Sequence, residues 1–358
     1  MQEKMQDFSS SSTIEINGRL IGPDQPVYTV AEMSANHNQD FNRAVEIVEA
    51  AAKAEADAVK LQTYRPDTIT IESDKEPFQI KEGPWKGRTL YDLYEEAYTP
   101  WDWQPKLQEI AHDHGLDLFS SPFDPTAVDF LEEMDVPVYK VASFENVDLP
   151  LIQRVAETGK PTIMSTGMAT LAEIDEAVRA YREAGGTDLS LLACTSSYPA
   201  PAEEMHLRRI PHLADTFDVV PGLSDHTLGT EVPVAAVSLG ARIVEKHLTL
   251  SRDDEGPDSD FSLEPDEFAE MVQAVRKTEK ALGEVRYETT EKESESETFR
   301  RSLFVVEDIE EGDTFTDENV RSIRPGHGLA PENYDEVIGR KAACDLKRGQ
   351  PLKWYHVC

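Results

Sequence analysis

Short runs of β-branched and apolar residues alternate with amphipathic helical patterns along most of the chain, and this alternation constrains the fold more than any other feature. The runs can be counted at residues 28–34, 58–64, 116–122, 138–143, 161–167, 189–196, 219–226 and 241–248. Helical patterns follow at, among others, 41–56, 125–134, 171–185 and 264–283. Strands that alternate with helices are typical of a parallel sheet. Eight pairs within about 260 residues favour a (β/α)8 TIM barrel over an open sheet.

Breaks in this pattern divide the chain into domains. We expect residues 1–26 to be an N-terminal extension and 27–285 to form the barrel. At 286–298 charged residues, Ser and Thr replace the apolar periodicity, which indicates a linker. Short strand patterns separated by turn sequences fill 299–358 and predict a small, mainly β domain. A long insertion at 65–100, between the second and third strands, is expected to be a functional loop or lid.

The charge and the cysteine content narrow the choice of partners and compartment. The 358 residues include 69 Asp and Glu against 35 Lys and Arg, a formal net charge of −34. This excess repels phosphate backbones and anionic lipids, so we expect no nucleic acid and no membrane surface as a main partner. An acidic surface also suits a salty cytoplasm. Only three cysteines occur, and neither an apolar signal segment nor a membrane-spanning run is found, so we expect a cytoplasmic protein.

Polar residues stand near the carboxyl end of nearly every predicted strand, which is where a barrel collects its chemistry. They include Glu32, Lys60, Gln62, Ser121, Lys140, Ser143, Ser165, Ser196, Ser224, His226, Glu245 and His247. Because side chains alternate along a strand, Lys60 shares one face with Gln62, and Glu245 shares one with His247. One such residue would be explained by a solvated strand end, but eight ends that converge on one mouth favour a binding site.

Two kinds of ligand fit these residues. His226 and His247 stand at the ends of adjacent strands, which lie under about 5 Å apart, so both imidazoles can reach one divalent ion. Two imidazoles leave positions open, which suits a Lewis acid that polarises a substrate oxygen. Lys60 and Lys140, with nearby hydroxyls, favour a phosphate or carboxylate. No Walker or GxGxxG motif occurs, so a nucleotide is not expected.

A series of segments points to a known family. In order along the chain they are AEMSANHNQDFNRA, ADAVKLQTYRPDTIT, FSSPFDPTAVDFLEEM, YKVASFE, STGMATLAEI, CTSSYPAP, GLSDHTLG, VEKHLTL and GPDSDFSLEP. Together they resemble the sialic acid synthase family, whose members condense phosphoenolpyruvate with an N-acylated amino sugar. The tail resembles that family's antifreeze-like (β-clip) domain. Segments such as LYDLYEEAYTPWDW, FRRSLFVVEDI and SIRPGHGL resemble the pseudaminic acid branch.

The resemblance implies a role for each matching residue. His226 and His247 would hold a divalent ion, manganese first and magnesium or cobalt as alternatives, and the catalytic set would be Glu32, Lys60 and His247. Phosphoenolpyruvate would be bound by Lys60, Ser121, Lys140, Ser143, Ser196 and Ser224, although the neuraminate branch usually has Asn where Ser196 stands. The sugar would contact Gln62, Tyr198, Glu245, Asp258 and Arg324. Arg324 would come from the antifreeze-like domain of a second subunit, in a domain-swapped homodimer.

Three alternatives stay open at this point. The first is a relative that makes neuraminate or legionaminate from a different amino sugar. The second is a sugar-binding barrel that keeps the charged mouth but has no turnover. The third is an aldolase in which Lys60 or Lys140 forms a Schiff base with the substrate.

Overall fold

The computed structural model describes residues 12–83, 85–254 and 256–358, and its main feature is a closed barrel. Eight parallel strands follow one another around it in the order β10, β3, β4, β5, β6, β7, β8 and β9. They are β3 (Tyr28–Glu32), β4 (Ala58–Thr63), β5 (Asp117–Pro122), β6 (Tyr139–Val141), β7 (Thr162–Ser165), β8 (Leu189–Cys194), β9 (Val220–Asp225) and β10 (Ile243–His247). Each predicted run contains one of these strands, so the predicted barrel is confirmed.

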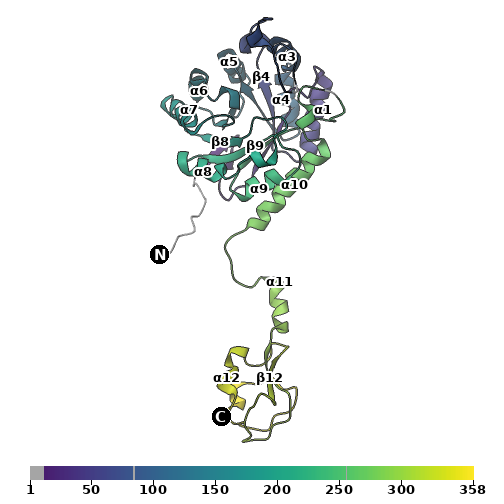
Figure 1. Cartoon of the computed structure of the whole chain (residues 1–358), viewed down its shortest axis with the longest axis vertical. Coiled ribbons are helices and arrows are strands. Elements are labelled where there is room, and N and C mark those ends of the chain that lie inside the picture. The colour runs from purple at the N-terminus through teal and green to yellow at the C-terminus, as the bar shows by residue number, and fades with distance from the viewer. Residues whose placement is uncertain (1–11, 84, 255) are drawn as a thin grey trace. The chain divides into compact units, whose positions relative to one another are not determined.

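Helices surround the barrel (Figure 1). They are α1 (Phe41–Lys53), α4 (Gln104–Asp113), α5 (Pro125–Glu133), α6 (Leu149–Ala156), α7 (Leu171–Glu183), α8 (Arg209–Phe217), α9 (Glu231–Ser238) and α10 (Pro265–Leu282). Several begin at a capping side chain. Asp40 accepts hydrogen bonds from the first turn of α1, Asp124 does so for α5, and Thr170 forms a capping box with Glu173 in α7.

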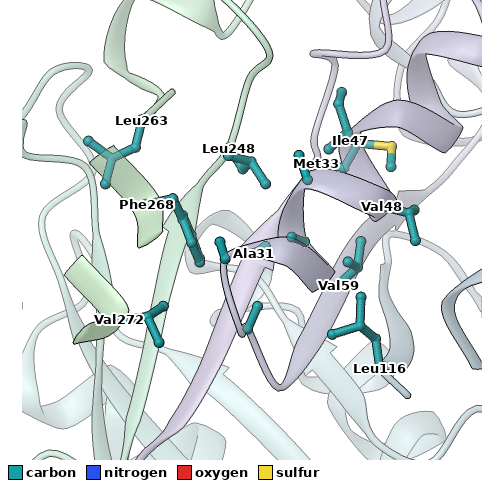
Figure 2. Close-up of a cluster of buried hydrophobic side chains, with 14 of the residues drawn as sticks. Ala31, Met33, Ile47, Val48, Val59, Leu116, Leu248, Leu263, Phe268 and Val272 are labelled. Atoms are coloured by element: carbon teal, nitrogen blue, oxygen red, sulfur yellow. The ribbon is translucent and has the colours of Figure 1, made fainter. Parts of the chain in front are cut away.

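The hydrophobic core lies between the outer face of the barrel and the helices. Figure 2 shows part of it, where Ala31 of β3 and Val59 of β4 lie near Ile47 of α1 and Phe268 of α10. All four side chains are fully buried. Residues of the opposite parity face the barrel interior, and in β10 they change from the apolar Ile243 at the amino end to Glu245 and His247 at the carboxyl end. The alternation therefore turns the polar carboxyl ends of the strands toward one mouth.

A hairpin precedes the barrel, in the part of the chain expected to be an extension. It consists of β1 (Ile14–Ile16) and β2 (Arg19–Ile21), which pair antiparallel. Ile14, Ile16 and Ile21 are buried in the same cluster as Tyr28 and Ile243, at the amino ends of β3 and β10. The hairpin thus packs against the end of the barrel opposite the polar mouth, a feature that the sequence pattern did not predict. Residues 1–11 lie outside the described part of the chain.

The insertion between β4 and α4 contains short helices rather than a strand or a long helix. They are α2 (Pro66–Ile69), the 3-10 turn η1 (Glu76–Phe78) and α3 (Leu90–Ala97). Thr89 caps α3 by accepting a hydrogen bond from the amide of Asp92. The insertion is therefore an ordered piece of structure over the residues described.

The chain divides into two compact units after Gly283. The segment predicted as a linker, 286–298, contains α11 (Glu291–Ser294) and most of the 3-10 turn η5 (Glu295–Phe299). The second unit contains β11 (Ser302–Val305) antiparallel to β12 (Val320–Ile323), isolated bridges, and α12 (Tyr334–Val337). Its core includes Leu303, Phe315 and Leu346. Within the residues described, no helix has the length and apolar character needed to cross a membrane.

Candidate active site

A cavity of about 220 Å³ opens among the carboxyl ends of the strands. Eleven of the predicted site residues line it: Glu32, Lys60, Gln62, Lys140, Ser143, Tyr198, Ser224, His226, Glu245, His247 and Asp258. Lys60 and Gln62 were expected to share one face of a strand, and Glu245 and His247 one face of another, and all four line the cavity. Strand register explains the convergence, because Glu32 stands opposite Lys60 on β4 and opposite His247 on β10.

A buried network of charged groups forms the floor of the cavity. The Lys60 ammonium lies 2.5 Å from Glu32 Oε2 and 3.7 Å from Glu245 Oε1. Lys140 reaches the same Glu245 oxygen at 3.7 Å, and Ser224 donates a hydrogen bond to it at 3.1 Å. Gln62 donates to the other oxygen of Glu32 at 2.9 Å. Two ammonium groups and two carboxyl groups thus share a space from which water is largely excluded.

Burial sets the protonation behaviour of this network. Burial raises the pKa of Glu32 to about 7. The positive charge of Lys60 lowers this pKa, and the negative charge of Glu245 raises it further. For Glu245, burial is outweighed by Lys140 and Lys60, which lower its pKa. Burial also lowers the pKa of Lys140, whereas Glu245 and Glu32 overcome burial and raise the pKa of Lys60. Glu32 can therefore exchange a proton near neutral pH beside a permanently charged Lys60.

The two histidines lie side by side, with ring centroids 5.3 Å apart. His226 Nδ1 is 2.9 Å from the carbonyl oxygen of Thr195, so this nitrogen donates, and in the neutral ring Nε2 has a free lone pair. Burial opposes a charge on His226, but the Cys194 thiol raises its pKa. For His247 burial lowers the pKa well below its usual value, so the ring is neutral. Its Nδ1 is buried without a hydrogen-bond partner among the described residues.

The His226 and His247 pair fits a divalent ion that keeps open coordination positions. The described residues contain no group of three or more His, Cys, Asp and Glu side chains arranged around a common point. A closed structural zinc site therefore does not fit. Two imidazoles with available nitrogens fit an ion whose other positions are filled by substrate or water oxygens.

Three predicted residues do not line the cavity. Ser121 lies behind Lys60, whose ammonium donates to its hydroxyl at 3.4 Å. Ser196 and Ser143 both lie against Gly167, since a Cβ on Gly167 would lie 2.2 Å from Ser196 Oγ and 2.7 Å from Ser143 Oγ. Arg324 lies in the second unit and is exposed.

Several lining residues were given no substrate or metal from the sequence. Ser165, at the end of β7, is buried and its hydroxyl has no partner among the described residues. Its position at a strand end put it among the polar residues expected at the mouth, but the family resemblance assigned it no role. Glu145 follows Ser143 by two residues, and burial raises its pKa to about 7. The insertion adds Ile69, Trp85, Leu93, Tyr94 and Ala97, for which the sequence offered no periodic signal.

Comparisons with known proteins identify the family of the chain. The model of the NeuB family matches residues 47–287, and that of the SAF domain matches 300–357. The pseudaminic acid synthase of Campylobacter jejuni is 46% identical over 92% of this chain and 96% of its own length. The N,N'-diacetyllegionaminic acid synthase of Legionella pneumophila is 34% identical over 97% of this chain and 99% of its own.

A solved structure extends the match to the fold. The crystal structure of a spore coat polysaccharide biosynthesis protein from Bacillus subtilis superposes with a TM-score of 0.66 at 32% identity, covering 97% of this chain and 99% of that one. The family model spans more than half of the chain, and the curated relatives match it nearly end to end. The chain, a (β/α)8 barrel followed by a SAF domain, therefore belongs to the NeuB family.

Proposed function

We propose that the chain is a pseudaminic acid synthase, which condenses phosphoenolpyruvate, 2,4-diacetamido-2,4,6-trideoxy-β-L-altropyranose and water to give pseudaminic acid and phosphate. The observation that carries the proposal is the meeting, in one cavity, of the Lys60 and Lys140 ammonium groups with the His226 and His247 pair. The 46% identity to a curated pseudaminic acid synthase supports the choice of this sugar over that of the legionaminic acid enzyme, at 34%.

The anionic substrate is assigned to the strand-end side of the cavity. Phosphoenolpyruvate carries a phosphate and a carboxylate, which require cations and hydroxyl donors. Lys60 and Lys140 supply the cations, while Ser143 and Ser224 line the same space. Ser121 and Ser196 act from behind this layer, Ser121 through its contact with Lys60. The buried hydroxyl of Ser165, which has no hydrogen-bond partner among the described residues, is a further donor for the phosphate or the carboxylate.

The reaction forms a carbon–carbon bond between the two substrates and a carbon–oxygen bond from water to carbon 2, and it breaks the carbon–oxygen bond to phosphate. Carbon 3 of phosphoenolpyruvate attacks the aldehyde carbon of the open-chain sugar, and positive charge develops at carbon 2. Water adds there, and the tetrahedral adduct expels phosphate. A divalent ion held by His226 and His247, for which manganese is the first candidate and magnesium or cobalt are alternatives, supplies Lewis-acid polarisation of the aldehyde.

Glu32 is placed to act on carbon 2. Gln62 holds one of its oxygens at 2.9 Å and Lys60 contacts the other at 2.5 Å, so the carboxyl group is fixed in position. In its charged form it stabilises the developing cation or orients the attacking water. Its pKa of about 7 also lets it accept a proton from that water at neutral pH.

The amino sugar is assigned to a second group of residues that line the cavity. Gln62, Tyr198, Glu245 and Asp258 line this space and offer amide, hydroxyl and carboxyl groups. Asp258 is held by hydrogen bonds from the Ser34 hydroxyl and the Ala35 amide. These groups can bind the sugar hydroxyls and N-acyl groups without a large rearrangement.

One assay separates this proposal from its alternatives. Purified protein should release phosphate from phosphoenolpyruvate only when both the altrose substrate and a divalent ion are present, and mass spectrometry should find the nine-carbon acid. Turnover of N-acetylmannosamine instead would favour a neuraminate synthase. Borohydride trapping of a lysine adduct would favour the Schiff-base aldolase, and no phosphate release with any sugar would favour a non-catalytic barrel.

We also propose that Arg324 acts on the sugar in a partner chain of a domain-swapped homodimer. Co-expression of His247→Ala and Arg324→Ala chains tests it, because a mixed dimer then has one barrel with His247 that receives Arg324 from its partner. Recovery of activity in mixed dimers supports exchange, whereas inactive mixed dimers contradict it. A cytoplasmic location is proposed as well, supported by the three free cysteines at Cys194, Cys344 and Cys358.

A further inference from the structure

Two walls line the cavity. The strand-end wall holds all of the charged groups among the described lining residues, including Glu32, Lys60 and Lys140, together with hydroxyls and apolar side chains such as Phe123 and Phe144. The facing residues that come from the insertion at 65–83 and 85–100 are all apolar or aromatic, and we call them the carbon wall: Ile69, Trp85, Leu93, Tyr94 and Ala97. Within these described ranges the insertion contributes no charged side chain to the cavity. One cavity therefore combines groups that bind ions with an apolar surface supplied by the insertion.

The carbon wall is held in place by the protein's own contacts. The indole N–H of Trp85 donates to the carbonyl oxygen of Pro257 at 2.9 Å, which leaves the ring as a hydrocarbon surface. The same ring lies 5.9 Å from that of Tyr198, which also lines the cavity. Leu93 is 6% exposed, and the ring of Tyr94 packs edge-on against Tyr64 at 5.5 Å. The wall is thus formed without a ligand, as a specificity surface requires.

The two walls divide the two substrates between them. Phosphoenolpyruvate is an anion with a single methylene group, so it gains nothing from the carbon wall and must lie against the lysines. The sugar then occupies the space that remains, and its far end meets the carbon wall. A hydroxyl group placed against Ile69, Trp85 and Leu93 would lose its water without finding a partner among these side chains, whereas a methyl group would gain from burial.

We propose that the carbon wall, through Ile69, Trp85 and Leu93, selects an amino sugar whose far end carries methyl groups, a 6-deoxy sugar with a second N-acetyl group, over one with a 6-hydroxyl group. This inference rests on the proposed function and names the residues that set its sugar specificity. Discrimination by an apolar pocket against one added hydroxyl is limited, on the order of tenfold to two hundredfold in kcat/KM. The wall therefore sets a preference and not an absolute barrier.

The test compares two sugars that differ at one atom. These are 2,4-diacetamido-2,4,6-trideoxy-altrose and its 6-hydroxy counterpart, each assayed with phosphoenolpyruvate and manganese. The wild-type protein should prefer the deoxy sugar by about tenfold or more in kcat/KM. Ile69→Thr should reduce this preference several-fold through the KM of the sugar, with the KM of phosphoenolpyruvate unchanged. Leu93→Asn is the second variant, and thermal melting of both shows whether they are folded.

Ile71→Thr is the matched control, because Ile71 lies two residues away, is 59% exposed and does not line the cavity. Its preference should equal that of the wild-type protein. A wild-type protein that turns over both sugars equally well, or folded Ile69→Thr and Leu93→Asn proteins that keep the full preference, would overturn the inference and leave the proposed function standing. Absence of phosphate release with either sugar would refute the proposed function and this inference together.

Discussion

A buried ion pair between Lys246 and Asp225 should hold the two histidines in register. Lys246 stands between Glu245 and His247 on β10, and Asp225 directly precedes His226 at the end of β9. The Lys246 ammonium donates to the Asp225 carboxylate and, at 2.6 Å, to the carbonyl oxygen of Thr227. Asp225 also accepts from the Thr227 amide at 2.9 Å. Both charged side chains are 0% exposed, so the pair ties together the two strand ends that carry the imidazoles.

Lys246→Met removes one partner and leaves a buried carboxylate without its counter-charge. Breaking a buried pair in this way costs about 3–5 kcal/mol, whereas removing both charges is often nearly neutral. We therefore expect Lys246→Met to lose about 3 kcal/mol or more of unfolding free energy, and Asp225→Asn combined with Lys246→Met to recover part of that loss. Because the pair positions both imidazoles from outside the barrel, the affinity for manganese should also fall, by about 10–100-fold.

Two measurements check this expectation. Urea unfolding gives the free energy of unfolding, and calorimetric titration with manganese gives the affinity of the folded protein. Lys53→Met is the control, because Lys53 forms an exposed pair with Glu49 at 4.0 Å, and its loss should cost no more than about 1 kcal/mol. If Lys246→Met unfolds as the control does and binds manganese as the wild-type protein does, the ion pair has no positioning role.

Three further outcomes follow from the site and the surface. His226→Ala and His247→Ala should each abolish metal-dependent turnover, and calorimetry with manganese should show weakened binding; a chelator-treated His247→Ala protein with full activity would exclude the metal site. Burial raises the pKa of Glu145 to about 7, so the native state binds the extra proton between about pH 4.5 and 7 and loses stability as pH rises through that range. Glu145→Gln should therefore be more stable than wild type at pH 8, by about 2 kcal/mol in urea unfolding, and should show little gain at pH 4.5. With a net charge of −34, activity should persist or rise in molar salt, and precipitation there would contradict adaptation to high salt.

The barrel was predictable because its signals are local and repeated. Each strand is a short apolar run, and the two-residue period fixes which side chains share a face. That is why Lys60 with Gln62, and Glu245 with His247, could be paired from the amino-acid sequence alone. The N-terminal hairpin was missed because its strands have only three residues each, too few to show a period. The mostly apolar helix α9, with the sequence EVPVAAVS, has no polar face and therefore shows no amphipathic pattern in the sequence.

Depth within the site could not be predicted from strand position. Ser121 and Ser224 both stand at strand ends, yet Ser224 lines the cavity and Ser121 lies behind Lys60. Which parts of the insertion face inward depends on long-range contacts, such as the one between Trp85 and Pro257, which are 172 residues apart. The contact between Lys60 and Ser121 and the contact between Trp85 and Pro257 leave no periodic signal in the sequence.

The charge of the cavity is also different from what the lysines alone suggested. Within the described residues the lining includes two lysines and four carboxyl groups, Glu32, Glu145, Glu245 and Asp258. A phosphorylated, carboxylated anion cannot enter such a space unless protons or a divalent ion offset the carboxylates. Burial raises the pKa of Glu32 and of Glu145 to about 7, and that of Asp258 above its usual value, so protons are available below neutral pH. The affinity for phosphoenolpyruvate should therefore fall as pH rises past about 7 in metal-free protein, and a bound divalent ion should flatten that dependence because it supplies the positive charge that the protons no longer provide.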